Sequence, residues 1–498
     1  MDENTPTEDG GAHRLRHGAL GGASAIVMAV AGTAPAYSLA ASTAVLIGAA
    51  ALAGPAALLW CGIPMFGIAL AFSYLGKSDV NAGASYSWVR KALHPALGFI
   101  SGWALVVSAT IFMVAAALPA GAGTLSLFNE NKTWSTGATT AVGAVWFLVM
   151  AAVVAVGITI TRAAQWIMSA IEVAILLIVA VMAAVHTTGR QGEPFSWSWF
   201  SPTHFSSVSG FAAAALVAAF YYWGWDVTAN LGEESKHSRL AALGGIIGVV
   251  IVFALFEVYT IETNLTFSQS YISANSSSDL VANLAAQVGG GTWGKIMIVA
   301  VMLSTIATLE TTLIQVSRSL FAMGRDNTLP RAFGKVGAAR TPLVATLAVT
   351  GVSLVLFLVS NLLHSVGTIM TDAITAIGIQ IAVYYSLAAL AVVVTYRREI
   401  LKSAANFVCI GLLPLIGSLF MIFILIESLA GTNLTAASKW VGLGALALGL
   451  IPLGYYWAKK SPYYTRGTTL ASETEVAVAA TAGLDEQPST TGATLADA

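Results

Sequence analysis

Apolar runs of twenty or more residues follow one another along almost the whole chain of 498 residues. A run of this length, wound as a helix that rises about 1.5 Å per residue, crosses a hydrocarbon layer of about 30 Å. Only 9% of the residues are charged, whereas roughly a quarter are charged in an average soluble domain. A water-exposed surface cannot be built from so few charges, so the chain is expected to fold in a lipid bilayer.

Twelve such runs can be placed, and they predict an all-α integral membrane protein with about 12 transmembrane helices. They cover residues 19–49, 53–75, 96–124, 138–161, 163–186, 208–231, 240–264, 293–321, 343–363, 367–395, 404–429 and 438–458. An even number of crossings puts both termini on one side. Residues 1–18 are then a cytoplasmic N-terminal segment, and residues 462–498, rich in Thr, Ala, Glu and Ser, a disordered cytoplasmic tail.

The distribution of Lys and Arg supports this topology, because loops that are translocated across a membrane are poor in both residues. Of the 23 Lys and Arg residues, the assignment leaves only Lys132, Arg190, Lys295 and Lys439 on the outer side. One missed span would exchange the two sides for every later loop. The sequence therefore predicts a multi-pass protein of the cell (cytoplasmic) membrane with both termini in the cytoplasm.

Two of the runs are interrupted halfway. Residues 32–35 of the first run end in Pro35, which lacks a backbone N–H and disrupts the preceding turn. The sixth run contains Gly224 and Asp226 at a comparable depth. A broken helix is tolerated in lipid only where protein or a water-filled cavity satisfies its backbone groups. Matched breaks in two halves of opposite orientation indicate an inverted-repeat transporter with a midplane site. A proline kink and a glycine packing contact are the alternative interpretation.

Four stretches resemble the amino acid permease branch of the amino acid, polyamine and organocation (APC) transporter superfamily. They read GTAPAYSLA at 32–40, GASYSWVRKALHPALGFISGW at 83–103, FYYWGWDVTANLGEESK at 220–236 and SRSLFAMGRDNTLPRAFGKV at 317–336. The resemblance implies a five-plus-five inverted repeat of the leucine-transporter type, here residues 19–186 and 208–395. It also implies two extra C-terminal helices, at 404–458, and alternating access around a central site.

The two interrupted segments form the predicted substrate site. The half-helix after the first break offers N–H groups and a partial positive charge to a carboxylate, and carbonyls freed in the sixth run can accept hydrogen bonds from an ammonium. The resemblance implies that Phe220 closes over the substrate, and packing in the core is the alternative. The predicted substrate-binding residues are Ala31, Gly32, Thr33, Ala34, Phe220, Tyr221, Tyr222, Trp223 and Gly224.

Ionisable residues inside a membrane are costly, and they are therefore candidates for function. The candidates are Glu172, Asp226, Glu257, Glu310 and Asp372. Many relatives in the resembled superfamily carry a Lys on the fifth helix, seven residues after a Gln, where its ammonium replaces a sodium ion. In this chain the residue seven after Gln165 is Glu172. The local charge is reversed, so the Lys-based coupling scheme does not carry over.

Glu172 and Glu310 are each expected to lie about 14 to 16 Å from the cytoplasmic ends of their helices. We hypothesise that they form a proton or cation site beside the first break, because paired carboxylates in a low dielectric hold a proton or attract a cation. Ser304, Thr305 or Thr308 would complete that site. Alternatively, each carboxylate accepts hydrogen bonds separately.

Two other acidic features follow the break in the sixth run. Asp226 is a further coupling candidate, since the resembled superfamily usually has an acid two residues after the glycine of its sixth helix. Glu233 and Glu234 follow at the cytoplasmic end, where a solvated or interhelical charge pairing, together with Lys236 and Arg239, is expected.

The predicted function is a secondary active transporter (permease) that moves amino acids or related small amines, with coupling to H+ or Na+ or by exchange. A polyamine or other organic-cation carrier is the alternative, with Glu257, Asp226 and Glu172 supplying an acidic cavity. A transporter-like nutrient sensor is a further possibility. The histidines are scattered without metal-ligand spacing, so neither a metal, a cofactor nor catalysis is expected. No basic patch suggests nucleic acid, and the lipid bilayer is the remaining partner.

Overall fold

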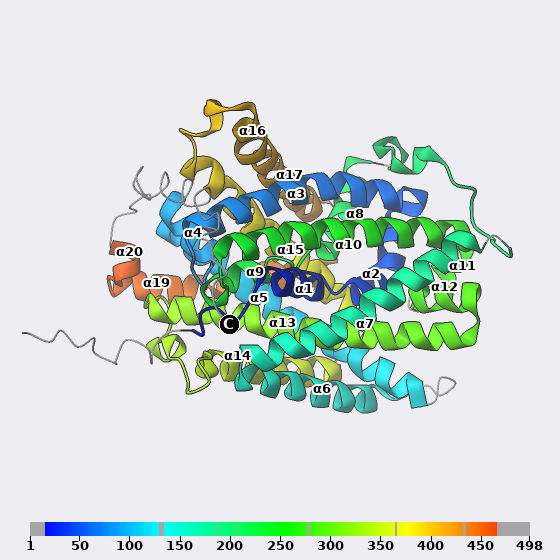
Figure 1. Ribbon diagram of the computed structural model, residues 1–498, viewed down its shortest axis with the longest axis horizontal. Coiled ribbons are helices and arrows are strands. Elements are labelled where there is room, and N and C mark those ends of the chain that lie inside the picture. The colour runs from blue at the N-terminus through cyan, green and yellow to red at the C-terminus, as the bar shows by residue number, and fades with distance from the viewer. Residues whose placement is uncertain are drawn as a thin grey trace, which may run out of the picture.

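The computed structural model describes residues 15–128, 134–186, 188–205, 207–275, 279–363, 366–431 and 435–465. Within these ranges the regular structure is helical, and one isolated β-bridge joins Leu20 to Ser235 (Figure 1). The predicted cytoplasmic segment 1–18 and the predicted disordered tail 462–498 lie outside the described residues except for 15–18 and 462–465. Residues 462–465 are helical and bury Tyr463, so the tail begins with an ordered turn.

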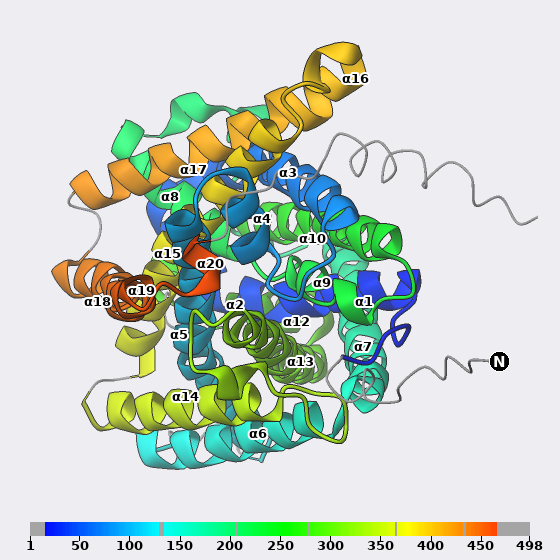
Figure 2. The same ribbon diagram turned by 90° about the vertical axis from the view of Figure 1, so that its left-hand side faces the viewer.

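The long helices run along the longest axis of the molecule in Figure 1, and several are seen nearly end-on in Figure 2. The α-helices are α1 (Gly22–Thr33), α2 (Pro35–Ala50), α3 (Gly54–Ser78), α4 (Ser85–Ala92), α5 (Pro95–Phe128), α6 (Thr136–Val156), α7 (Ile158–Val185), α8 (Val208–Tyr221), α9 (Val227–Asn230), α10 (Ser238–Thr266), α11 (Gln269–Ala274), α12 (Leu280–Gly289), α13 (Gly291–Arg325), α14 (Leu343–Leu363), α15 (Val366–Thr395), α16 (Ala404–Asn406), α17 (Leu413–Ala430), α18 (Ala436–Leu448), α19 (Leu450–Ala458) and α20 (Pro462–Thr465).

Shorter elements connect some of these helices. One of them is a π-helical turn, η8 (Phe407–Leu412), that leads from α16 into α17. The others are single 3₁₀ turns: η2 (Ala51–Ala53), η3 (Trp197–Phe200), η4 (Pro202–His204), η5 (Gly232–Glu234), η6 (Arg331–Gly334) and η7 (Ile400–Lys402).

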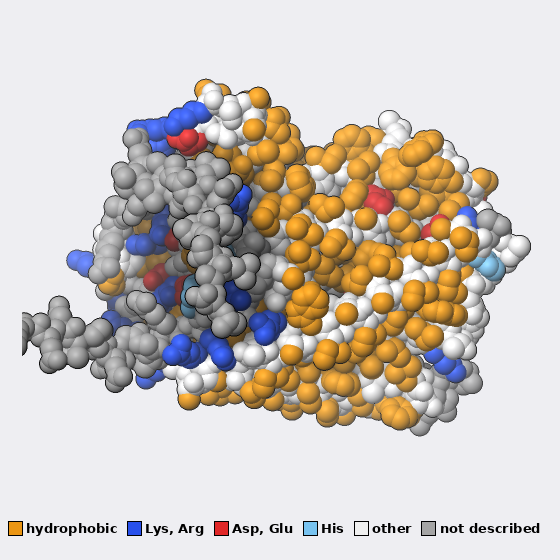
Figure 3. Space-filling view, viewed as in Figure 1, with side chains coloured by type: hydrophobic (Ala, Val, Ile, Leu, Met, Phe, Trp, Pro, Cys, Tyr) orange, Lys and Arg blue, Asp and Glu red, His pale blue; other side chains and the backbone are white. Residues whose placement is uncertain are grey.

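The outward faces of the bundle are apolar. Exposed side chains on α7 and α14 include Ile167, Val181, Leu347 and Val355, and Figure 3 shows such side chains along the flank of the molecule. Among the described residues, nine helical segments are long and apolar enough to cross a membrane. Three shorter apolar helices lie at Val208–Tyr221, Leu280–Gly289 and Leu343–Val359. An apolar exterior of this extent identifies a multi-pass membrane protein.

Lys and Arg side chains gather at one end of the molecule, on the left in Figure 3. We call this the basic end. It carries α4, the segment from η5 to the start of α10, the C-terminal end of α13, and α19 with α20 (Figure 1).

Both predicted interruptions are present, and they touch. α1 ends at Thr33 and α2 begins at Pro35, with Ala34 between them in the left-handed region (φ 47°, ψ 65°). The sixth run is helical to Tyr221 and resumes as the short α9, with Gly224 at φ +103° in the gap. A Cβ added to Gly32 would overlap the carbonyl oxygen of Gly224, and the reverse also holds. The backbones of the two breaks therefore meet at a contact that only glycine permits.

One predicted boundary between runs is wrong. The sequence put the turn between the fourth and fifth runs at 161–163, whereas α6 ends at Val156 and α7 begins at Ile158. The chain turns at Gly157, where φ is +136°, a backbone conformation that glycine adopts without the strain that a side chain would cause. The residues around Gly157 are as apolar as the helices, so hydropathy alone does not reveal the turn.

Three helices in the connections were not predicted. They are α4 beyond the second run and α11 and α12 before α13. The longest of them, α12, has 10 residues, whereas about 20 are needed to cross a hydrocarbon core. A search for runs of membrane-spanning length therefore passes over all three.

α13 lies inside the bundle and packs against α5, α7, α1 and α2 (Figure 2). Every side chain from Ser304 to Gly324 is buried, although the segment contains hydroxyl, amide, carboxyl and guanidinium groups. Because buried polar groups need partners, this helix is expected to organise the polar contacts of the interior.

Candidate functional site

The first turn of α2 has its backbone donors occupied by the protein itself. Pro35 has no N–H, the Ala36 N–H donates to Glu172 Oε1 at 2.9 Å, and the Tyr37 N–H donates to Ser304 Oγ at 3.2 Å. Ser304 Oγ in turn donates to Glu172 Oε1 at 2.6 Å. The Glu172 carboxylate, fully buried, therefore caps the half-helix at its partially positive end.

The carbonyls at the end of α1 are bound from α13 and α2. Thr308 Oγ1 donates to the Gly32 carbonyl at 3.1 Å, and Ser38 Oγ donates to the Thr33 carbonyl at 2.7 Å. Thr305, also a candidate, donates instead to the Val301 carbonyl of its own helix at 2.6 Å. Of the three predicted α13 hydroxyls, those of Ser304 and Thr308 thus bind at the break, whereas that of Thr305 binds only its own helix.

Glu310 lies at a different level from Glu172. Its Oε2 accepts from Gln165 Nε2 at 2.7 Å, and the same amide nitrogen donates to the Ala307 carbonyl at 2.8 Å. Gln165 and Glu172 are two helical turns apart on α7, about 10 Å along the axis. Glu172 and Glu310 therefore accept hydrogen bonds from separate partners, which was the alternative to a shared carboxylate pair.

The second break carries a relay of side-chain hydrogen bonds. Trp223 Nε1 donates to the Tyr384 hydroxyl at 2.6 Å, and that hydroxyl donates to Asp226 Oδ2 at 2.9 Å. Asp226 is fully buried, and its Oδ1 has no partner among the described residues. Tyr384, on α15, was not predicted, because nothing in a tyrosine within an apolar run reveals a contact with a residue 158 positions away.

Four aromatic rings gather beside the two breaks. Phe220 lies 6.5 Å from Tyr37 and 6.3 Å from Phe112, and Phe112 lies 5.3 Å from Trp223, measured between ring centroids. Tyr37 and Phe112 are 5.8 Å apart. We call Tyr37, Phe112, Phe220 and Trp223 the aromatic cluster. Phe220 and Trp223 were predicted site residues, whereas Tyr37 and Phe112 were missed.

Tyr221 and Tyr222 have hydrogen-bond partners on α2 and α3. The Tyr221 hydroxyl donates to Thr43 Oγ1 at 2.9 Å, and the Tyr222 hydroxyl donates to the Leu58 carbonyl at 3.1 Å. Both rings pack on Phe256 of α10. Both predicted residues thus hold α8 to its neighbours through their side chains.

Similar proteins are found among amino acid permeases. The amino acid permease family matches residues 20–450. The chain belongs to the amino acid permease family. Similar proteins include the branched-chain amino acid permease BcaP of Lactococcus lactis, 25% identical over 63% of this chain and 70% of its own length. They also include the serine/threonine exchanger SteT of Bacillus subtilis, 23% identical over 78% of this chain and 85% of its own. The low-affinity putrescine importer PlaP of Escherichia coli is 24% identical over 80% of this chain and 85% of its own length.

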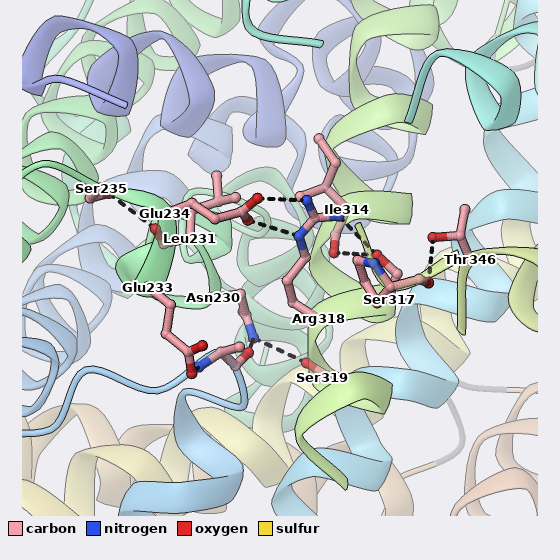
Figure 4. Close-up of polar contacts among 12 residues, drawn as sticks. Asn230, Leu231, Glu233, Glu234, Ser235, Ile314, Ser317, Arg318, Ser319 and Thr346 are labelled. Carbon is pink, nitrogen blue, oxygen red and sulfur yellow. Dashed lines mark hydrogen bonds and ion pairs between the residues drawn. The ribbon is translucent and has the colours of Figure 1, made fainter. Parts of the chain in front are cut away.

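In this member of the permease family, the basic end is held together by a buried ion pair (Figure 4). Arg318 of α13 and Glu234 of η5 form two hydrogen bonds, Nε to Oε2 at 2.9 Å and Nη2 to Oε1 at 3.0 Å. The neighbouring Glu233 pairs with Arg325 at 3.0 Å and also accepts from the Ala82 N–H.

The two glutamates of this permease form interhelical charge pairs, one of the two expectations, but with other cations than those named beside them. Glu233 and Glu234 pair with arginines of α13, and not with Lys236 and Arg239 of their own segment. The segment is fixed in another way, because Leu20 exchanges backbone hydrogen bonds with Glu234 and Lys236. The strand-like bridge at Leu20 keeps Glu234 directed toward α13, where a complete partner for its carboxylate is available.

Proposed function

We propose that the chain is a secondary active transporter that carries an amino acid or a related small amine across the cytoplasmic membrane by alternating access. The observation that carries this proposal is the backbone contact of the two broken helices at Gly32 and Gly224, inside a bundle with an apolar exterior. Broken helices at matched positions are the usual setting of a midplane substrate site. The names of the similar proteins, two for amino acids and one for putrescine, support the same class.

The substrate and coupling residues of this proposal are those of the two breaks. The substrate would lie against Ala31 to Ala34, Phe220 and Trp223 to Gly224, under the aromatic cluster. Glu172, Asp226 and Glu310, with the α13 hydroxyls, are the proposed proton or cation groups, since each acid is buried in the membrane-spanning part.

Uptake into proteoliposomes tests the function directly. Labelled amino acids and putrescine are offered in turn, with an imposed pH or Na+ gradient, and the internal contents are analysed. We expect one class to accumulate chemically unchanged and above protein-free liposomes, as a carrier requires and an enzyme does not. Binding without accumulation would favour the nutrient sensor. If the folded protein neither binds nor takes up any of these compounds, the proposal is contradicted.

We also propose the finer architecture that the family membership suggests. The chain would cross the membrane twelve times, with residues 19–186 and 208–395 as inverted repeats of five helices and 404–458 as two more. The basic end would face the cytoplasm, together with segments 1–18 and 462–498. The excess of Lys and Arg at this end supports that orientation.

Single cysteines test this orientation. In a background without Cys61 and Cys409, we expect a membrane-impermeant maleimide to label Ser198→Cys in intact cells. Lys335→Cys should react only after permeabilisation, because it lies at the basic end. Both positions are exposed, so a difference in labelling reports the side of the membrane. The reverse pattern would contradict the proposed topology.

Replacing Tyr384 by Phe is expected to lower uptake about tenfold. The substitution leaves Trp223 Nε1 without its acceptor and Asp226 Oδ2 without its donor, and an unsatisfied buried group costs about 1–3 kcal/mol. Initial rates of uptake at equal protein density measure the effect. Tyr259→Phe is the matched control, because it removes one buried hydroxyl contact, to the Leu176 carbonyl, that involves no residue of either break. Equal rates in the two variants would argue against a functional relay.

A further inference from the structure

The candidate site contains two unusual features that concern its substrate. The first backbone donors of α2, which would receive a carboxylate, are already bound, and the carboxylates of Glu172 and Asp226 each keep one oxygen without a partner among the described residues. Glu172 contributes to both features, and their consequence for the substrate rests on the proposed transport function.

Four residues account for the donors at the start of α2. Pro35 has none, Ala36 donates to Glu172 and Tyr37 donates to Ser304. The Ser38 N–H donates to the Ala34 carbonyl at 2.8 Å. The first N–H groups of a helix are otherwise free and form the usual anion receptor. In this chain the side-chain carboxylate of Glu172 already occupies that receptor.

The charge of the site also favours a cationic substrate over one with a carboxylate. In the part of the chain that the structure describes, no Lys or Arg forms an ion pair with Glu172 or Asp226. Glu172 Oε2 and Asp226 Oδ1 are buried oxygens without partners among the described residues. A substrate carboxylate would add negative charge beside the carboxylates of Glu172 and Asp226, and the first N–H groups of α2 are not free to meet it. An ammonium would supply the missing donors and the opposite charge.

The aromatic cluster suits such a cation. Its four rings come from α2, α5, α8 and the break after α8, with neighbouring centroids 5.3 to 6.5 Å apart. The faces of aromatic rings attract alkylammonium groups, and the attraction strengthens where water is excluded. The same rings give an alkyl chain an apolar lining.

We propose that Glu172 is a specificity-determining residue that takes the place of a substrate carboxylate, so that the site accepts amines without a carboxylate and disfavours zwitterionic amino acids. The built-in carboxylate caps α2 whether or not substrate is bound. Glu172 thereby makes the contact with the start of α2 that the carboxylate of an amino acid substrate would otherwise make.

Pairs of compounds that differ only in the carboxylate test this assignment. The probes are lysine with cadaverine, leucine with isoamylamine, and histidine with histamine, each measured for binding and for uptake in proteoliposomes. For the full-length protein we expect the amine of a pair to bind about tenfold or more tightly than its amino acid, the amount expected of one charge-assisted hydrogen bond. Preference for the amino acid in all three pairs would overturn the proposal and leave the transport function intact.

Substitution of Glu172 gives the reciprocal test. Glu172→Ala releases the Ala36 N–H, so we expect the amino acid to gain affinity and the amine to lose it. Glu172→Gln keeps an acceptor for Ala36 but removes the charge, and it should weaken amine binding without helping the amino acid. The matched control, Glu427→Gln on α17, should leave the ratio of the two affinities unchanged.

The outcomes distinguish the assignment of Glu172 from the transport function itself. If Glu172→Ala fails to fold, the Gln variant and the wild-type pairs still decide the result. A ratio that neither Glu172 variant changes would overturn the assignment of Glu172, even if uptake itself is observed. Failure of both compound classes to bind or move would overturn the proposed function together with this inference.

Discussion

Replacing Arg318 by Gln is expected to lower transport by about a hundredfold or more. The Arg318 and Glu234 side chains are 1% and 0% exposed, and two hydrogen bonds join them. Removing one partner of a buried ion pair leaves the other charge unpaired, which costs about 3–5 kcal/mol, or roughly two to three powers of ten in an equilibrium constant. The lost contact joins η5 to α13. The arrangement that is destabilised is therefore the one in which this end is packed closed, with Arg318 and Ala322 buried.

Accessibility of a buried position on α13 measures this opening. Ala322 is fully buried one turn beyond Arg318, and Ala322→Cys in a background without Cys61 and Cys409 reports whether reagent enters from the basic end. We expect fast labelling with Arg318→Gln and slow labelling without it. Slow labelling and normal transport in the folded variant would contradict a role for the pair in closing this end.

Two further variants identify the cause. Arg325→Gln removes the neighbouring pair with Glu233, whose side chains are 38% and 21% exposed, and partly solvated pairs contribute about 1 kcal/mol or less. Its effect should be about tenfold smaller than that of Arg318→Gln. The double variant Glu234→Gln with Arg318→Gln leaves no unpaired charge and should recover much of the closed state.

The sequence predicts the helices and the breaks well, because both depend on local chemistry. An apolar run forms a helix in lipid whatever lies beside it, and Pro35 or Gly224 interrupts a helix through its own backbone. The turn at Gly157 was missed for the converse reason. Glycine is common inside membrane helices, and only the backbone conformation reveals that this one ends a helix.

The partners within the site could not be predicted in the same way. Glu172 contacts Ala36 and Ser304, which are 136 and 132 positions away in sequence. A depth estimate put Glu172 and Glu310 at one level, whereas their hydrogen bonds are two helical turns apart. An error of a few residues at a helix end moves a side chain by several ångströms at about 1.5 Å per residue, which exceeds the length of any hydrogen bond.

Replacing Gly32 or Gly224 by Ala is expected to abolish transport and to lower the thermal stability of the protein in detergent. Each new Cβ would overlap the carbonyl oxygen of the other glycine, and Gly224 also has a φ of +103° that strains any L-residue. Overpacking alone costs about 1–3 kcal/mol, and an unfavourable backbone conformation adds about 1–3 kcal/mol. Unfolding temperature, followed by uptake of any variant that folds, measures both effects.

The chain offers a matched control for this prediction on the helix that begins at the break. A Cβ at Gly48 of α2 would meet no atom within 4 Å, and Ala is about 1 kcal/mol more favourable than Gly inside a helix. Gly48→Ala should therefore transport normally and unfold at the same temperature or slightly higher. Normal transport by Gly32→Ala and Gly224→Ala would mean that the two backbones can separate without consequence. The meeting of the broken helices would then be a packing contact, and the substrate site would have to lie elsewhere.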